Sequence, residues 1–312
     1  MRRKIYTELL KWKEEEAGRT ALLIDGARRV GKSYIVENFA KQEYKSYIII
    51  DFNRVNQEVT ELFENYLNDL DLFFMYLSNY YNVKLYERDT LIIFDEVQLF
   101  PRARAAIKYL VADGRYDYIE TGSLMSIKKN VKDIVIPSEE RHLRMYPLDF
   151  EEFLWANAEY SLSREIRRHF SPLTPLGKEL HQKALSQFYL YLVTGGMPLS
   201  ILEYRREKKL LMVPDIQQKL LELILSDISS QAPTGMTRHC QNAWLSIPAQ
   251  LEKSSRRFQY SLITKGATAK TYEKPLDWLL RSGYALACRR TSLHLYPTDC
   301  GLCARVLGVP SY

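Results

Sequence analysis

The sequence has few cysteines and no long apolar run. Four cysteines in 312 residues are too few for the disulfide framework that holds many secreted domains together. No stretch of about 18 apolar residues occurs, which argues against a membrane-spanning helix. The first residues, MRRKIYTELLKWKEEE, lack the apolar core of a signal peptide and read as an amphipathic helix. These absences favour a cytoplasmic protein with no membrane partner.

Acidic side chains are scarce in the last third of the chain. Residues 201–312 hold 16 Lys or Arg against 9 Asp or Glu, a balance of +7, whereas the other 200 residues hold 28 against 29. An uneven basic charge of this kind favours contact with DNA. The alternative is an ordinary solvated basic face, which needs no partner.

The stretch TALLIDGARRVGKS, residues 20–33, carries the clearest chemical pattern. An apolar strand runs into G-x-x-x-x-G-K-S, and the following YIVENFAKQ has helical spacing. Strand, glycine loop and helix form the context of a phosphate-binding loop, with the helix amino terminus directed at the anion. Lys32 is expected to reach the β- and γ-phosphates, and the Ser33 hydroxyl to ligate Mg²⁺. The residues expected to contact the nucleotide are Gly26, Ala27, Arg28, Arg29, Val30, Gly31, Lys32, Ser33 and Tyr34.

A second pattern predicts the catalytic acids. The apolar run Thr90–Phe94 leads into Asp95 and Glu96, and parallel strands end at one edge of a sheet, where α/β ligands bind. Asp95 is expected to hold Mg²⁺ through water and Glu96 to polarise the attacking water. The alternative is an ordinary exposed acidic pair at the end of a strand.

Hydroxyl groups follow the next apolar run. Asp117–Glu120 is read as a strand that ends in Thr121-Gly122-Ser123. This strand is expected to lie between the strand before the glycine loop and the strand before Asp95. Thr121 and Ser123 are candidates for contact with the γ-phosphate or the attacking water. Either hydroxyl could instead cap a helix, a role that Ser and Thr commonly take.

Strands that alternate with helical segments predict a parallel α/β sheet over residues 1–148. Further strands are expected at 47–52 and 143–146, and one helical pattern covers 57–82. From residue 149 to about 230 the pattern is helical and predicts a lid. Residues 231–312 are read as helices followed by a two-stranded hairpin, a pattern typical of a winged helix.

Two further sets of residues have open interpretations. Arg141 and Arg144 are candidates for an arginine supplied to a neighbouring site in a homo-oligomer, with surface charge as the alternative. Cys288, His294, Cys300 and Cys303 include one spacing that suits zinc. The segment DCGLCARVLG also reads as a helix, in which small buried thiols are common.

The motifs together resemble a prokaryotic family of AAA-type ATPases, in which an ATP-binding core precedes a DUF4143-type domain. The resemblance rests on GARRVGKS, LIIFDEVQ, ETGSL, YPLDFEEFLWA, VTGGMP and FQYSLITKGATAKTYEKPLDWLLRSG. It implies ATP and Mg²⁺ as ligands and ATP hydrolysis as the activity. Relatives usually continue into a nuclease-like region, which is expected to be missing here.

Motifs and resemblance lead to one main expectation and two rivals. The main expectation is an ATPase whose nucleotide state repositions a helical lid and a basic winged helix. One rival is a DNA-binding regulator that uses ATP as a ligand with little or no hydrolysis. The other is a degraded remnant, whose core still folds but which no longer has a functional effect.

Overall fold

Residues 1–122, 140–207, 209–253, 257–289 and 293–306 are described by the computed structural model, and their contacts define two units. The core unit comprises Arg3–Gly26 and Gly31–Met145. The helical unit comprises Met1–Arg2, Ala27–Val30 and Tyr146–Tyr312, so it includes the middle of the glycine loop.

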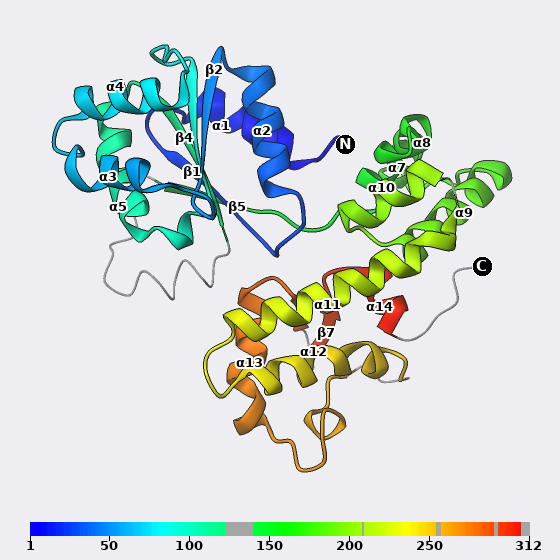
Figure 1. Ribbon diagram of the computed structural model, residues 1–312. Helices are drawn as coiled ribbons and strands as arrows, with labels where there is room; N and C mark the ends of the chain where they lie inside the picture. The colour runs from blue at the N-terminus through cyan, green and yellow to red at the C-terminus, as the bar shows by residue number, and fades with distance from the viewer. Residues whose placement is uncertain (123–139, 208, 254–256, 290–292, 307–312) are drawn as a thin grey trace. The chain divides into compact units, whose positions relative to one another are not determined.

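A parallel sheet forms the centre of the core unit (Figure 1). Its strands are β1 (Ala21–Asp25), β2 (Ser46–Asp51), β3 (Thr90–Asp95), β4 (Asp117–Gly122) and β5 (Glu140–Arg144). Their order is β2-β3-β4-β1-β5, and every neighbouring pair is parallel. Each residue of β1 is buried, which explains its continuous apolar run, because central parallel strands are covered on both faces. The parallel α/β sheet predicted from the sequence is thereby confirmed.

Helices cover both faces of this sheet. They are α1 (Ile5–Glu15), α2 (Lys32–Glu43), α3 (Gln57–Asn65), α4 (Leu70–Tyr81) and α5 (Pro101–Asp113), with the short turn η1 (Val97–Leu99) before α5. Helices α1 and α2 lie on one face, and α3, α4 and α5 lie on the other (Figure 1). The single helical pattern expected over 57–82 is divided in two, because the Asp69 carboxylate accepts from the Leu72 amide at 3.1 Å and caps a new helix.

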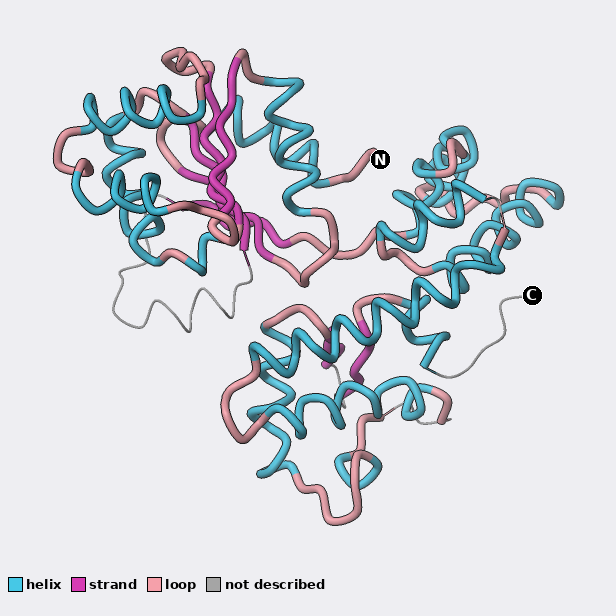
Figure 2. Tube along the Cα trace, viewed as in Figure 1, coloured by secondary structure: helices cyan, strands magenta, loops and turns pink. Residues whose placement is uncertain are grey.

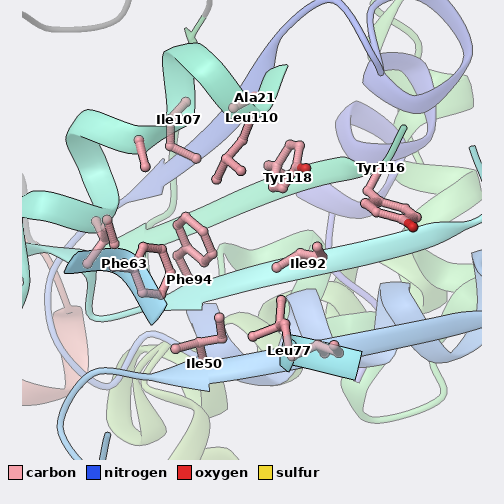
Figure 3. Close-up of a cluster of buried hydrophobic side chains, with 14 of the residues drawn as sticks. Ala21, Ile50, Phe63, Leu77, Ile92, Phe94, Ile107, Leu110, Tyr116 and Tyr118 are labelled. Carbon is pink, nitrogen blue, oxygen red and sulfur yellow. The ribbon is translucent and has the colours of Figure 1, made fainter. Parts of the chain in front are cut away.

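Aromatic and aliphatic side chains together fill the core between the sheet and the α3–α5 layer (Figure 3). Phe63 and Phe94 meet edge to face with ring centroids 5.6 Å apart, and Tyr118 lies against Phe94. Such pairs are stabilising beyond their burial by about 0.5–1.5 kcal/mol. The core holds β3 and β4 in place, and these are the strands that end in the predicted acids and hydroxyl.

The fifth strand was placed wrongly from the sequence. It was expected at 143–146, but β5 spans Glu140–Arg144 and therefore begins with polar residues. The buried Arg104 guanidinium donates to Glu120, and also to Glu140 at 3.1 Å, so charged side chains lie inside the core. Burial raises the pKa of the Glu120 carboxyl well above its ordinary value, although Arg104 opposes that shift. A search for apolar runs cannot find a strand that is stabilised by a buried ion pair.

The helical unit consists mainly of helices joined by loops, with a short hairpin (Figure 2). Its elements are α7 (Phe150–Ala156), α8 (Tyr160–Phe170), α9 (Lys178–Thr194), α10 (Pro198–Glu207), η2 (Leu210–Met212), α11 (Val213–Gln231), α12 (Thr237–Leu251), η3 (Tyr260–Leu262), α13 (Ala269–Arg281), β6 (Ala285–Arg289), β7 (Leu293–Pro297) and α14 (Cys300–Val306). Strands β6 and β7 are antiparallel. Among the described residues no single helix is long and apolar enough to cross a membrane. By length and composition alone, α9 and α10 would pass that test as a pair, with a bend of 117° between them.

The P-L-D-F and G-G-M-P segments meet inside the helical unit. The Leu148 amide donates to the Gly196 carbonyl at 2.8 Å, and Asp149 forms a capping box with Glu152 at the start of α7. A Cβ on Gly196 would lie 2.1 Å from the Leu148 carbonyl oxygen. The Gly196 amide donates to the buried Asp299 carboxylate just before α14. These contacts explain why glycine occupies this turn.

Gly196→Ala should lower the free energy of unfolding by about 1–3 kcal/mol, because the added methyl group forces backbone apart in a packed turn. Thermal and urea unfolding, followed by circular dichroism, would measure the change. Leu199→Ala is the control, since its side chain in the adjoining helix is 45% exposed and should change stability by less than about 0.5 kcal/mol. Equal stability of the two variants would contradict the close approach at Gly196.

Candidate functional site

The glycine loop joins β1 to α2 at the carboxyl edge of the sheet. The Met145 amide donates to the Asp25 carbonyl at 2.7 Å, and a Cβ on Gly26 would lie 2.2 Å from the Met145 carbonyl oxygen. Gly31 precedes α2 with φ 97°, a left-handed conformation that glycine adopts without strain. The first amides of α2 lack intrahelical acceptors and form the positive end of the helix. The loop thus has the features of an anion-binding site.

Lys32 and Ser33 begin α2 and place two chemical groups at this edge. Lys32 is 6% exposed, and its Nζ donates to the Gly26 carbonyl at 3.1 Å, across the loop. The Ser33 hydroxyl donates to Asp95 Oδ1 at 2.8 Å, although the two residues are 62 positions apart. The structure therefore brings the glycine loop and the acid at the end of β3 into direct contact.

Thr121 connects the acids to the central strand β4. Its side chain is fully buried, its hydroxyl donates to Asp95 Oδ1, and it accepts from the Glu96 amide at 3.3 Å. The strand lies between β1 and β3 and extends through Gly122. Thr121 thus contacts the Asp95 carboxylate and the Glu96 backbone, which neither interpretation of the sequence described. Ser123 lies outside the described residues.

Glu96 is half-buried and has an uncommon backbone conformation. Its φ of 55° and ψ of 44° are left-handed, a region that non-glycine residues rarely occupy. The Gln98 side-chain amide donates to Glu96 Oε2, and Gln98 is only 1% exposed. Gln98 was not predicted from the sequence as a site residue. The signal that could have indicated it is a polar residue between the apolar Val97 and Leu99.

The two arginines of the loop share one carboxylate within the helical unit. Arg28 Nη1 lies 2.9 Å from Asp227 Oδ1 on α11, and Arg29 pairs with the other carboxylate oxygen. Asp227 is 4% exposed. This residue was also missed, although it interrupts the apolar face of LELILSDISS. Of the other loop residues, Ala27 and Val30 are buried, and the Tyr34 side chain is 57% exposed.

Two arginines within β5 pair with carboxylates of the core unit. Arg141 Nη1 donates to Glu16 at 2.7 Å, and Arg144 Nη2 donates to Asp25 at 3.0 Å. These pairings bring Arg144 beside the start of the glycine loop and Arg141 beside α1. Their use by a neighbouring copy of the chain stays a prediction.

A zinc site finds no support in the part of the chain that the structure describes. No group of three or more potential metal ligands occurs there. Cys288 and His294 are paired across the β6–β7 hairpin, while Cys300 begins α14 and donates to the Tyr191 carbonyl at 3.5 Å. Burial raises the pKa of the Cys300 thiol to about 12, which disfavours the thiolate that a metal requires.

The donor set at the sheet edge fits a magnesium-bound nucleoside triphosphate. Hydroxyl and carboxylate oxygens, which are the ligands Mg²⁺ prefers, meet at Ser33 and Asp95. An ammonium group and the amino terminus of α2 supply positive charge for phosphates. Glu96 supplies a carboxylate that can accept a proton. The arrangement can therefore bind phosphates, hold a divalent cation and orient a water molecule.

Comparisons with known families agree with this geometry. Residues 18–154 match the model of an AAA domain family, and residues 185–312 match that of a domain of unknown function, DUF8612. The family resemblance seen in the sequence anticipated DUF4143, so the match in the second half differs from that expectation. No curated protein matches the chain.

Similar folds occur among solved structures. The Walker-type ATPase PABY2304 of Pyrococcus abyssi aligns with a TM-score of 0.58 at 14% identity, over 98% of this chain and 95% of that one. The Orc2 protein of Aeropyrum pernix, solved as ADPNP and ADP complexes, gives a TM-score of 0.45 at 15% identity, over 97% and 91%. The first alignment shows similarity of fold. Residues 18–154 thus match an AAA domain in sequence, and the chain is similar in fold to a Walker-type ATPase.

Proposed function

We propose that the protein binds ATP with Mg²⁺ and hydrolyses it, and that its nucleotide state repositions a helical lid at 149–230 and a basic winged-helix segment at 231–312. The observation that carries the proposal is the 2.8 Å contact between the Ser33 hydroxyl and Asp95, beside Lys32. Phosphate release from ATP by the purified protein, with Mg²⁺ and with excess chelator, tests it. Equal release under both conditions, or no release at all, would refute the magnesium-dependent hydrolysis.

Each residue of the site has an expected role. Lys32 neutralises the β- and γ-phosphates, and Ser33 and Asp95 hold Mg²⁺ when it is bound. Glu96 accepts a proton from the attacking water, and Thr121 keeps the two acids in place. Positioning and charge neutralisation carry most of the catalysis in phosphoryl transfer, so these roles are sufficient.

The pairing of Arg28 and Arg29 with Asp227 supports the link between nucleotide and helices. Phosphate oxygens and a carboxylate compete for the same guanidinium groups. When a nucleotide attracts the arginines, the loop releases Asp227 and thereby α11. Contacts to the γ-phosphate are lost on hydrolysis and commonly serve as conformational switches.

Asp227→Asn should tighten ATP binding about 3- to 10-fold, because it removes the negative charge that competes with phosphate while it preserves side-chain shape. Titration with a fluorescent ATP analogue would measure the affinity. Asp215→Asn, an exposed change in the first turn of the same helix, is the matched control and should leave the affinity unchanged. Weaker binding by Asp227→Asn would contradict the competition.

A DNA-binding regulator that uses ATP only as a ligand is the second candidate, and the net charge of +7 over residues 201–312 favours it. Salt-dependent DNA binding without ATP turnover would support this candidate over the first. Affinity that falls equally for all DNA sequences as salt rises would indicate contacts to the phosphate backbone alone.

A further inference from the structure

In the turn after Glu96, the buried side-chain amide of Gln98 contacts the Glu96 carboxylate. The Leu99 amide donates to the Glu96 carbonyl at 3.0 Å, which closes the short η1 turn. Gln98 lies within this turn, and its Nε2 donates to Glu96 Oε2. Backbone and side chain of the same three-residue turn therefore bind the two ends of Glu96.

The backbone of Glu96 needs such restraint. A left-handed conformation is unfavourable for a non-glycine residue and persists only where surrounding contacts maintain it. The Glu96 amide is held by Thr121 at 3.3 Å, and the carboxylate is held by Gln98. Strain of this kind gathers at functional sites, where it fixes the direction of a side chain.

The contact requires a hydrogen-bond donor on the side chain of residue 98. A side-chain amide nitrogen only donates, so its carboxylate partner must present an oxygen lone pair. A hydrogen bond to a carboxylate stabilises a buried amide, and this contact places Gln98 Nε2 against Glu96 Oε2. With Oε2 engaged, Oε1 is the carboxylate oxygen left to accept a proton.

We propose that Gln98 is the positioning residue for Glu96 during ATP hydrolysis. This inference rests on the proposed ATPase function. Gln98 holds Oε2, and Oε1 accepts the proton of the attacking water as the water oxygen bonds to the γ-phosphorus. The bond from that phosphorus to the β–γ bridging oxygen breaks, so ADP and inorganic phosphate form, and Glu96 returns its proton to solvent.

Gln98→Met preserves the length of the side chain and removes the donor. We expect kcat to fall about 10- to 100-fold, because the Glu96 carboxylate, which accepts the proton of the attacking water, loses its orientation. ATP affinity should change less than about twofold, because the phosphate-binding loop is intact. Gln98→Glu, which sets a second carboxylate against the first, should lower kcat at least as far. Tyr109→Gln, on α5 at a side chain 62% exposed, is the control and should retain the original rate.

A double-mutant cycle separates positioning from a general structural role. In a Glu96→Gln background, adding Gln98→Met should leave single-turnover hydrolysis unchanged, because Gln98 acts through the carboxylate that is already absent. Full additivity of the two changes would overturn the inference. It would also be overturned if Gln98→Met kept the original kcat, or if it lowered the melting temperature and ATP affinity together with the rate. Absence of turnover in the unaltered protein would refute the ATPase function itself, a different and distinguishable result.

Discussion

Replacing Glu96 with glutamine should lower ATP turnover about 10²- to 10⁴-fold and leave ATP binding intact. The amide matches the carboxylate in shape but cannot accept the proton of the attacking water. Glu96 lies beyond the end of β3 and next to Asp95, which contacts Ser33 of the glycine loop. The substitution therefore leaves both the phosphate-binding loop and the pair expected to hold Mg²⁺ unchanged.

Single-turnover hydrolysis and nucleotide titration should be measured on the same Glu96→Gln preparation. Glu58→Gln is the control, because Glu58 is an exposed residue in the first turn of α3 and lies outside the site. Retention of the full rate by Glu96→Gln would remove Glu96 from its catalytic role. Loss of nucleotide binding in parallel with the rate would show that Glu96 has a structural role instead.

Lys32→Ala should weaken ATP binding about 10- to 100-fold, since charge-assisted hydrogen bonds are stabilising by about 1.5–3 kcal/mol. Turnover should fall further, because the lysine also neutralises charge that develops in the transition state. The side chain is nearly enclosed and its Nζ lies against the Gly26 carbonyl, so its position is set before any ligand binds. Preorganised charge of this kind stabilises an anion strongly.

The control for Lys32→Ala is Lys41→Ala, on the same helix, where the lysine pairs with Glu37 and its side chain is 53% exposed. Both variants should be checked by thermal unfolding, because removal of a buried lysine can alter stability. Equal ATP turnover by Lys32→Ala and the unaltered protein would exclude this loop as the source of hydrolysis.

Local patterns in the sequence were sufficient for the central architecture. Buried parallel strands require continuous apolar runs, and the loop between β1 and α2 requires glycine where Gly26 meets Met145 and where Gly31 has positive φ. Both requirements act within a few residues, so they leave a readable pattern. The contact of Ser33 with Asp95 follows from them, because parallel strands end at a common edge.

Pairings between distant polar side chains depended on tertiary structure. Arg28 and Arg29 pair with Asp227, which lies almost 200 positions away in the sequence. No local pattern in either segment predicts this pairing. Arg104 pairs with Glu120 and Glu140 inside the core, which is why the polar start of β5 escaped detection.

Gln98, which donates to the Glu96 carboxylate, lies close to it in the sequence, yet the sequence did not predict the contact. Gln98 contacts the carboxylate where Glu96 adopts left-handed backbone angles. Residue preferences do not predict that conformation for a glutamate. The sequence by itself thus determined the sheet, the loop and the position of Asp95 and Glu96 at the end of β3, because burial and backbone geometry select residue types locally. Tertiary structure alone decided which polar groups restrain those residues, because hydrogen bonds and ion pairs require atoms to meet in space.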